Sequence, residues 1–525
     1  MNSSDIDSLL QPDAYPDPTS TVQLIQTHVS LLFITDQFVY KVKKPVALGF
    51  LNFTTLQRRF FYCHEELRLN RRLAPELYLT VVPIRKSSRG VSFHGSGAVV
   101  EYAVKMVRLP EELMMNRLLT QGTVTTDQIR DLAGIVARFH LAAAAGPEIA
   151  PHGSPEAISG NWEESFNTVR QFVGTTVSPA DFHLIRRWVE RFLQDHELLL
   201  RRRVSDGFIR EGDGDLHSGN ICLTSPPVIF DCIEFSERYR CLDTAADVAF
   251  LLMDLHYYGA GSLARDFLAE YRAITGDVGA GELLTFYACY WAFIRGEVES
   301  ITAHDPNLPP GERNRAEESA RRHFRLARGI ILREKLPQTL FITCGLSGSG
   351  KSAVAGELAF QLGTELLSSD LLRKRLAGIP ATTRGDGDGS DSIYGPSFTR
   401  RTYDTLRELA GDILEEGASV VVDATFRDPR ERKLFRDLAR ISGVRFMILY
   451  LRCSQKLLLE RLLAREGRRD LISDARTEQY LRQKNEFRPP KIVPGEVMVV
   501  DTAETLLHTV DVLLTSLGVL PCGHD

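Results

Sequence analysis

Two short stretches of this chain carry residue types and spacings that suit phosphate chemistry. The first is Gly345-Leu-Ser-Gly-Ser-Gly-Lys-Ser352, which satisfies the pattern G-x-x-x-x-G-K-[ST] at every position. Its glycines allow backbone N–H groups to close around phosphate oxygens at a helix N-terminus, where the helix dipole favours an anion. The residues that we expect to hold nucleotide phosphates are Gly345, Ser347, Gly348, Ser349, Gly350, Lys351 and Ser352.

Two side chains of this loop have separate expected roles. Lys351 would reach the β- and γ-phosphates and act in catalysis, and Ser352 would ligate Mg²⁺. The apolar run before the loop is typical of a buried strand, and the run after it predicts a helix that ends at Gly363. This strand–loop–helix context is the one that the motif requires, so we predict ATP and Mg²⁺ as cofactors.

Two carboxylates and two arginines that follow the loop complete a candidate phosphotransfer site. Asp370 comes just after an expected strand and would act as a base towards an attacking hydroxyl, or else cap the next helix. Asp423 ends an apolar strand and would hold Mg²⁺ or its water. Arg461 and Arg465 lie four residues apart on one predicted helix, where they would neutralise charge as part of a catalytic lid or form a solvated face.

The second stretch is Asp213-Gly-Asp-Leu-His-Ser-Gly-Asn220, which lies well before the first. In it, Asp215 would accept the proton of an acceptor hydroxyl, and Asn220 would bind one Mg²⁺ ion. Asp231, at the next expected strand, would bind the metal that bridges the phosphates. The spacing therefore indicates a second phosphotransfer site.

Residues far from this second stretch would serve the same site. Lys41, on an expected third strand, is placed to pair with the phosphates, and Glu66 on the following helix is its candidate partner. Lys43 is a competing choice, because it shares a face of the strand with Lys41. Asp247 is the candidate for a buried carboxylate that fixes the loop around Asp215.

The elements that must position these residues follow two patterns. Residues 21–110 alternate apolar and polar positions in five runs, with one helical run between the third and fourth, which is the order of a kinase N-lobe. Residues 125–330 are mostly helical in pattern. From residue 338, apolar strands (339–344, 418–423, 445–452 and 496–500) alternate with amphipathic helices, which predicts an α/β unit with a parallel sheet.

The same patterns predict the domain organisation. Residues 315–337 are rich in helix formers and predict a connecting helix. Loops are expected at 302–314, which holds three prolines, and at 379–396, which is rich in Gly and Asp. The expected parts are a polar tail or capping segment (1–20), a first domain (21–330) with an N-lobe (about 21–110) and a helical C-lobe (about 111–330), and a second domain (338–518).

Composition limits the class of protein. The chain has 525 residues, of which 43% are hydrophobic and 25% charged, as in globular proteins of more than one domain. A net charge of −5 gives no reason to expect a nucleic-acid partner. There is no secretory signal, no membrane-spanning run and no C-x-x-C pair among the eight cysteines, so we expect a reduced cytoplasmic protein.

Residues 338–515 resemble a family of small P-loop kinases that includes polynucleotide kinase, the zeta toxins and gluconate kinase. The resemblance is carried by GLSGSGKS, SSDLLRKRL, VVVDATF and SDA. It implies phosphoryl transfer to a hydroxyl, with Asp370 as base and lid arginines. The sequence Asp423-Ala-Thr lacks the Asp-Glu pair of a hydrolysing nucleotidase, which favours a kinase over an ATPase.

Residues 20–330 resemble the aminoglycoside-phosphotransferase and choline-kinase branch of kinase-like enzymes, whose loop reads H-G-D-x-H-x-x-N. The whole chain resembles bacterial bifunctional proteins that join such a domain to a P-loop ATP-binding domain. The resemblance implies a multidomain fold: an N-terminal α+β protein-kinase-like (aminoglycoside-phosphotransferase-like) part and a C-terminal α/β P-loop NTPase part with a parallel sheet.

Three functional hypotheses stay open at this point. In the first, each half transfers the γ-phosphate of ATP to the hydroxyl of its own small molecule. In the second, the P-loop half is the only active kinase and the kinase-like half is a sensor, because Asp213 stands where such loops have His and a carboxylate there would raise a neighbouring pKa. In the third, the chain is a polynucleotide-end or toxin-like kinase.

Overall fold

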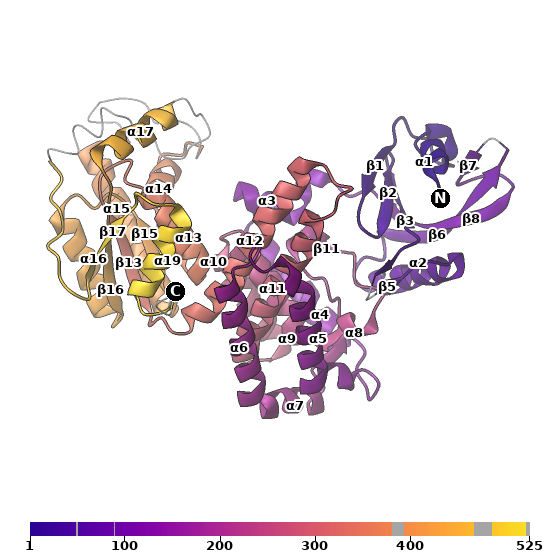
Figure 1. Ribbon diagram of the computed structural model, residues 1–525, viewed down its shortest axis with the longest axis horizontal. Helices are drawn as coiled ribbons and strands as arrows, with labels where there is room; N and C mark the ends of the chain where they lie inside the picture. Colours follow the sequence, from indigo (N-terminus) through magenta and orange to yellow (C-terminus); the bar gives the residue numbers. More distant parts are fainter. Residues whose placement is uncertain (49–50, 89, 381–392, 467–485, 521–525) are drawn as a thin grey trace. The chain divides into compact units, whose positions relative to one another are not determined.

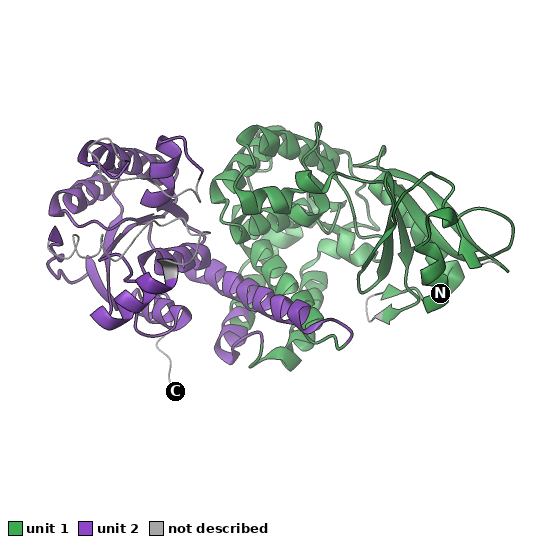
Figure 2. Ribbon diagram, turned by 90° about the horizontal axis from the view of Figure 1, so that it is seen from above, with its two compact units in different colours: residues 1–175, 186–306 green, residues 176–185, 307–525 purple. Residues whose placement is uncertain are grey.

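A computed structural model describes the chain except for residues 49–50, 89, 381–392, 467–485 and 521–525. The described chain divides into two compact units (Figure 2). The first consists of Met1–Thr175 and Arg186–Pro306, and the second of Thr176–Ile185 and Asn307–Asp525.

The N-terminal part of the first unit is a six-stranded antiparallel sheet in the order β1-β2-β3-β8-β6-β7. On β3, Tyr40 and Val42 are buried in a cluster on one face of the sheet. Because side chains alternate along a strand, Lys41 and Lys43 emerge on the other face, towards helix α2. The elements are β1 (Gln23–Gln26), β2 (Ser30–Ile34), β3 (Phe38–Lys43), β4 (Ala47–Leu48), β5 (Leu51–Asn52), α2 (Leu56–Asn70), β6 (Tyr78–Ser87), β7 (Gly90–Ser92) and β8 (Ala98–Val107).

The first residues of the chain, expected to be a polar tail or a capping segment, form a cap on this sheet. Helix α1 (Ser3–Leu9) starts with a capping box between Asn2 and Asp5, and a 3₁₀ turn (Pro12–Ala14) follows. Leu9 and Tyr15 are buried in the same cluster as Tyr40, and α1 and α2 lie on opposite sides of the sheet (Figure 1). The apolar side chains of this otherwise polar segment are buried in the cluster, and this burial holds the segment against the sheet.

The rest of the first unit is mainly helical and carries two short antiparallel strand pairs, β9 with β12 and the hairpin β10–β11. The β10–β11 hairpin separates Asn220 from Asp231 in the chain while holding their neighbours together. Its elements are α3 (Met115–Gln121), α4 (Thr126–Ala142), α5 (Pro155–Val169), α6 (Pro179–Asp195, which begins in the second unit), α7 (Glu197–Ser205), β9 (Ile209–Glu211), β10 (Ile221–Cys222), β11 (Val228–Ile229), α8 (Glu237–Arg240), β12 (Cys241–Asp243), α9 (Thr244–Tyr257), α10 (Gly261–Thr275) and α11 (Gly281–Ala303), with 3₁₀ turns at Glu111–Leu113, Ala150–Gly153, Arg170–Phe172 and Ser218–Asn220.

The second unit contains a five-stranded parallel sheet in the order β14-β15-β13-β16-β17, with helices on both faces (Figure 1). One apolar cluster joins the sheet to α13 and α19, and another joins it to α15 and α16. The elements are α12 (Pro310–Arg333), β13 (Thr339–Cys344), α13 (Lys351–Leu362), β14 (Glu365–Ser368), α14 (Ser369–Leu376), α15 (Pro396–Glu415), β15 (Val420–Asp423), α16 (Pro429–Ile441), β16 (Arg445–Arg452), α17 (Gln455–Glu466), β17 (Val497–Asp501) and α19 (Leu506–Ser516).

The predicted fold class is confirmed: a kinase-like α+β part precedes an α/β P-loop part with a parallel sheet. One local expectation is wrong, because the loop expected at 302–314 is shorter. Helix α11 runs to Ala303, and α12 begins at Pro310, whose missing N–H costs nothing in the first turn of a helix. Most of the Gly/Asp-rich segment 379–396 lies outside the described residues. None of the described helices combines the length and apolar character that a membrane crossing needs.

Candidate active sites

In the first unit, Lys41 joins two carboxylates that are distant in sequence. Its Nζ atom lies 2.8 Å from Oε1 of Glu66 on α2, and it also contacts Asp231 after β11. Burial alone would lower the pKa of Lys41, but the carboxylates of Asp231 and Glu66 outweigh it and hold the pKa well above its ordinary value. Lys41 is therefore charged, and the predicted Lys41–Glu66 pair is present.

Lys43 occupies a more enclosed position on the same strand. Its Nζ atom lies 2.6 Å from Oε2 of Glu66 and contacts Glu234, and its side chain is 1% exposed, against 12% for Lys41. Burial would raise the pKa of Glu66, yet the two lysines hold it at about 2. Sequence reasoning missed Glu234, because only the folded chain brings residues after β11 under β3.

The loop around Asp215 presents a partly exposed carboxylate. The Asp215 side chain is 34% exposed, and its Oδ2 atom accepts a hydrogen bond of 2.8 Å from the amide of Asn220. Burial opposes ionisation, but the nearby His217 and Arg295 together with Asn220 hold the pKa of Asp215 below its ordinary value. The group is thus an ionised hydrogen-bond acceptor, as a general base must be before it takes a proton.

Asp247 supports this loop from behind. Its two carboxylate oxygens accept backbone hydrogen bonds from Asp213 (2.7 Å) and Gly214 (2.9 Å), and one of them lies 3.2 Å from Nε2 of His140. The predicted role of Asp247 as the buried carboxylate that fixes the loop matches these contacts. His140, which also contacts Tyr271 at 2.8 Å, was not foreseen, because it comes from the distant helix α4.

Asp213, which replaces the His of related loops, is 1% exposed. Burial, then the neighbouring Asp247 and Asp215, raise the pKa of Asp213 well above its ordinary value. Its Oδ1 atom accepts the backbone N–H of Asp215 at 3.1 Å. These surroundings favour the protonated form of Asp213 more than water does. This differs from the expectation that Asp213 raises a neighbouring pKa, since the pKa of Asp215 is lowered.

Asn220 and Asp231, the predicted metal ligands of this site, flank one short hairpin. Directly beyond the β10–β11 pairing, the backbone N–H of Phe230 donates to the carbonyl of Asn220 at 3.0 Å. Asp231 follows with a φ angle of 69°, a left-handed conformation that is costly for a residue other than Gly. Two residues with oxygen-bearing side chains thus flank the same end of the hairpin, and oxygen is the ligand type that Mg²⁺ prefers.

In the second unit, the glycine-rich loop connects β13 to α13 at the carboxyl edge of the sheet. Gly345, Gly348 and Gly350 have φ angles of 153°, 85° and 87°, a region that other residues rarely adopt. A Cβ atom on Gly345 would lie 2.4 Å from the carbonyl oxygen of Leu451. Lys351 opens the helix, and its Nζ atom donates to the carbonyl of Leu346 at 2.8 Å, within the loop.

The other predicted residues of the P-loop site lie near the same edge. Asp423 ends β15 and accepts a hydrogen bond of 3.1 Å from the hydroxyl of Thr343 on the neighbouring strand. In the parallel register, Asp423 lies beside Ser368, the last residue of β14. Asp370 follows in the first turn of α14, where its charge acts on the buried Arg373. Neighbouring strand ends therefore bring Asp370 and Asp423 to the edge that carries the loop.

The predicted lid arginines belong to α17. Arg461 donates to the hydroxyl (3.0 Å) and the carbonyl (2.6 Å) of Thr502, whose hydroxyl in turn donates to the carbonyl of Ser349 in the loop. Arg461 is thus connected to the phosphate loop through one residue. Arg465 lies on the last turn of α17, and Ser352 is an exposed residue of the first turn of α13.

The residues of the loop fit a nucleotide phosphate and its magnesium ion. The glycines keep space that a Cβ atom would fill, and the buried Ser349 hydroxyl has no hydrogen-bond partner among the described protein groups. Ser352 and Asp423 provide the oxygen ligands that Mg²⁺ prefers. In the part of the chain that the structure describes, no group of three or more His, Cys, Asp or Glu residues lies close enough together to hold a metal ion.

Comparison with known proteins agrees with this architecture. Residues 340–490 match the family model of an AAA domain. Together with the parallel sheet and the glycine loop, this match decides the fold of the second unit. The C-terminal unit is a P-loop NTPase domain. Uncharacterized proteins of Mycobacterium tuberculosis and Mycobacterium bovis are 29% identical to this chain over 459 residues, which cover 87% of this chain and 89% of each relative.

Several solved structures are similar to part of this chain. A gluconokinase from Sinorhizobium meliloti is 23% identical over 35% of this chain and 93% of its own, with a TM-score of 0.26. The APS kinase CysC of M. tuberculosis, in complex with AMPPNP and APS, is 18% identical over 35% of this chain and 98% of its own, with a TM-score of 0.25. Aminoglycoside 2'-phosphotransferase-IIIa is 15% identical over 62% of this chain and 99% of its own, with a TM-score of 0.39.

Proposed function

We propose that the chain is an ATP- and Mg²⁺-dependent phosphotransferase with two centres, each of which transfers the γ-phosphate to a hydroxyl of a small molecule. The kinase-like and P-loop folds both support phosphotransferase activity in general. The observation that carries the proposal for the kinase-like centre is that Lys41 contacts Glu66 and Asp231 while Asn220 holds the ionised Asp215. A binding-only sensor would not need this full set of charged groups.

In the kinase-like centre, Asp215 takes the proton of the acceptor hydroxyl as that oxygen attacks the γ-phosphorus. Lys41 neutralises negative charge on the phosphates and is oriented by Glu66. Mg²⁺, when bound by Asn220 and Asp231, supplies further charge neutralisation across the phosphate oxygens.

In the P-loop centre, backbone N–H groups of residues 345–350 and Lys351 hold the β- and γ-phosphates. Asp370 is the proposed base, and Arg461 and Arg465 are proposed to neutralise charge from α17. Ser352 and Asp423 would hold Mg²⁺. The contact chain from Arg461 through Thr502 to Ser349 supports a role for α17 beside the phosphates.

The experiment that tests this proposal is transfer of label from γ-labelled ATP to fractionated metabolites, with wild type, Lys351→Ala and Asp215→Asn compared. We expect each variant to lose a different labelled product. The exposed residues Lys335 and Asp206 supply matched controls, Lys335→Ala and Asp206→Asn, which should lose neither. If Asp215→Asn changes nothing while Lys351→Ala abolishes all transfer, the kinase-like half is a sensor and the two-centre proposal is wrong.

A further inference from the structure

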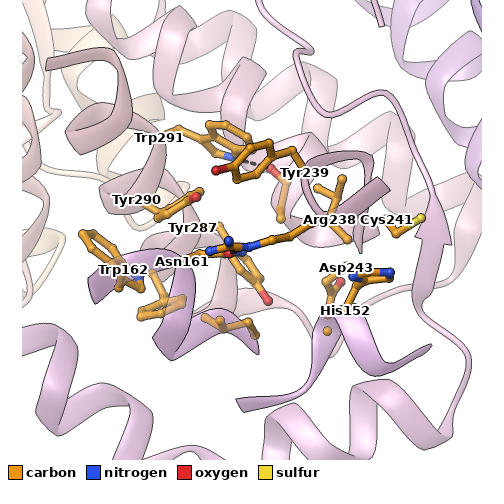
Figure 3. Close-up of a pocket in the computed structure, with 15 residues that line it drawn as sticks. His152, Asn161, Trp162, Arg238, Tyr239, Cys241, Asp243, Tyr287, Tyr290 and Trp291 are labelled. Atoms are coloured by element: carbon orange, nitrogen blue, oxygen red, sulfur yellow. Dashed lines mark hydrogen bonds between the residues drawn. The ribbon is translucent and has the colours of Figure 1, made fainter. Parts of the chain in front are cut away.

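Asp215 and Asp231 are supported from different parts of the first unit. Asp247 on α9 holds the backbone before Asp215. Helix α9 is held in turn by α11, because the indole N–H of Trp291 donates to the carbonyl of Ala246, the neighbour of Asp247, at 2.7 Å (Figure 3). The support of Asp215 thus comes from the helical part. The segment that begins with Asp231, in contrast, receives contacts from the N-terminal sheet and from helix α2.

The backbone of residues 230–233 donates four consecutive hydrogen bonds to four different acceptors. The first N–H donates to the carbonyl of Asn220 at 3.0 Å, and the fourth donates to the carbonyl of Asp213 at 3.1 Å. These two bonds tie the segment to the two ends of the stretch that carries the proposed base. The second and third N–H groups, those of Asp231 and Cys232, donate to side chains instead.

Tyr78 supplies the acceptor for the N–H of Asp231. Its hydroxyl oxygen lies 3.1 Å from that nitrogen, and Tyr78 is 1% exposed. Tyr78 is the first residue of β6, and the pairing of β6 with β8 shifts register between Tyr78 and Thr80, an irregularity of the kind that re-aims a side chain. The ring is buried in an apolar cluster that joins β6 to α2 and to Phe230. The ring therefore belongs to the same cluster as the residue before Asp231, while its hydroxyl reaches the backbone of Asp231.

Asn70 supplies the acceptor for the next N–H, that of Cys232. Oδ1 of Asn70 accepts it at 2.9 Å, and Nδ2 donates to the carbonyl of Glu66, one helical turn earlier on α2, at 3.0 Å. Asn70 is 2% exposed, and both ends of its amide have partners. Helix α2 thus provides Glu66 as one carboxylate partner of Lys41, and through Asn70 it supports the backbone beside the other partner, Asp231.

The backbone of Asp231 needs such support, because its φ angle of 69° lies in the left-handed region. For a residue other than Gly this conformation costs free energy, which surrounding contacts must offset. The Asp231 side chain is 40% exposed, so its own burial offsets little of that cost. A buried N–H group without an acceptor costs free energy as well. Removal of the Tyr78 oxygen would therefore favour other backbone conformations at Asp231.

We propose that Tyr78 and Asn70 are positioning residues of the kinase-like centre. Their side-chain oxygens hold the backbone of Asp231 and Cys232, and this hold keeps the Asp231 carboxylate at Lys41 and available to a divalent cation. The inference rests on the proposed function, in which Asp231 is a ligand of Mg²⁺. Tyr78 and Asn70 act through Asp231 and not on the nucleotide itself.

The first test is amide hydrogen exchange of the full chain, followed by mass spectrometry. Tyr78→Phe keeps the ring and removes the oxygen, so exchange in the segment 230–233 should become roughly fivefold faster. Tyr40→Phe is the matched control, because Tyr40 is buried on the opposite face of the sheet and its hydroxyl donates to a carboxylate oxygen of Asp17 at 2.7 Å. This control should leave exchange in the segment 230–233 unchanged.

The second test is binding of Mn²⁺ together with a non-hydrolysable ATP analogue, followed by electron paramagnetic resonance. Mn²⁺ replaces Mg²⁺ because both ions suit oxygen ligands, and Lys351→Ala is the background that silences the P-loop centre. We expect Asp231→Ala to weaken Mn²⁺ binding at least roughly tenfold, Tyr78→Phe to weaken it roughly fivefold and Tyr40→Phe to leave it unchanged.

A combination of variants separates a positioning role from a general loss of structure. When Asp231→Ala is already present, Tyr78→Phe should weaken Mn²⁺ binding no further, because the hydroxyl acts through Asp231. Asn70→Ala removes the acceptor at Cys232 and should weaken Mn²⁺ binding in the same direction. It serves as the second variant if Tyr78→Phe does not fold.

The outcomes separate this inference from the proposed function. Equal exchange in Tyr78→Phe and Tyr40→Phe would overturn the inference, as would a further loss of Mn²⁺ binding when Tyr78→Phe is added to Asp231→Ala. If Asp231→Ala weakens Mn²⁺ binding and Tyr78→Phe does not, the metal role of Asp231 holds and the positioning role of Tyr78 is wrong. If Tyr78→Phe speeds exchange but Asp231→Ala leaves Mn²⁺ binding unchanged, the hold on the backbone is confirmed and the metal role of Asp231 in the proposed function is wrong.

Discussion

The ammonium of Lys41 lies 2.8 Å from Oε1 of Glu66, and Lys43 holds the other oxygen of the same carboxylate at 2.6 Å. The two lysines therefore share one buried partner but differ in their second partner. Lys41 contacts the partly exposed Asp231, whereas Lys43 contacts the buried Glu234. In the proposed function Lys41 has the phosphate role, and this arrangement predicts a structural role for Lys43; one experiment separates the two roles.

Lys41→Met should impair nucleotide binding with little loss of stability, because Lys43 still neutralises Glu66. Lys43→Met should instead lower the free energy of unfolding by roughly 3 kcal/mol, because it leaves buried carboxylates without their cation. The measurements are binding of a fluorescent ATP analogue in a Lys351→Ala background, which silences the other centre, and thermal unfolding. The assignment is wrong if Lys43→Met loses nucleotide binding while its melting temperature is unchanged.

Asp213→Asn should leave the kinase-like centre active, because burial and the neighbouring Asp247 and Asp215 raise the pKa of Asp213 and so favour the uncharged carboxyl, which an amide resembles. Because folding raises the pKa of this carboxyl, the folded state binds a proton more tightly than the unfolded state does. The free energy of unfolding of wild type should therefore fall as pH rises from the ordinary Asp range through the raised pKa. The variant should lack that fall. The measurements are melting temperature and kcat/KM as functions of pH, with Asp206→Asn as the control. A loss of activity as complete as that of Asp215→Asn would contradict the prediction.

Gly345→Ala should abolish nucleotide binding at the P-loop centre. Its φ of 153° disfavours a side chain, and the new Cβ would meet the Leu451 carbonyl at 2.4 Å, so the loop must shift. Gly356→Ala is the matched control within the following helix, because a Cβ atom there meets nothing within 4 Å. This substitution should stabilise the helix by roughly 0.5–1 kcal/mol. Nucleotide binding is measured in an Asp231→Ala background. Unchanged affinity in Gly345→Ala would show that the loop tolerates a side chain there.

Glu297→Gln should stabilise the protein at alkaline pH. Burial raises the pKa of Glu297 from 4.5 to about 7, although Ser165 and Thr168 donate hydrogen bonds to it. Wild-type stability therefore falls as pH rises between those two values, and the penalty reaches roughly 3 kcal/mol at pH 8. Chemical denaturation at pH 5 and pH 8 measures it. The difference in free energy of unfolding between variant and wild type should be larger at pH 8 than at pH 5. An equal difference at both pH values would mean that Glu297 does not titrate between them.

The fold around the phosphate loop could be predicted closely because it depends on local sequence. The glycine positions, the preceding apolar strand and the following helix lie within one short segment, and the strands at 339–344 and 445–452 have the predicted bounds. Parallel strands also share a carboxyl edge, so Asp423 could be placed near the loop from its position at the end of an apolar run.

The contacts of the kinase-like centre could be identified only from the tertiary structure. Sequence order suggested Lys41 and Glu66, but it did not distinguish Lys41 from Lys43, because both lie on one face of β3. Glu234 and His140 had no local signal, since each reaches the site from an element distant in sequence.

The amino-acid sequence by itself determined the two fold classes, the phosphate loop and the order of the acidic residues, because periodicity and local turn chemistry depend on near neighbours. Only the tertiary structure decided the raised pKa of Asp213, the separate partners of Lys41 and Lys43, and the contacts that support Asp231. These properties depend on burial and on contacts between elements far apart in the chain, and the free energy of a buried charge is set by what surrounds it in space.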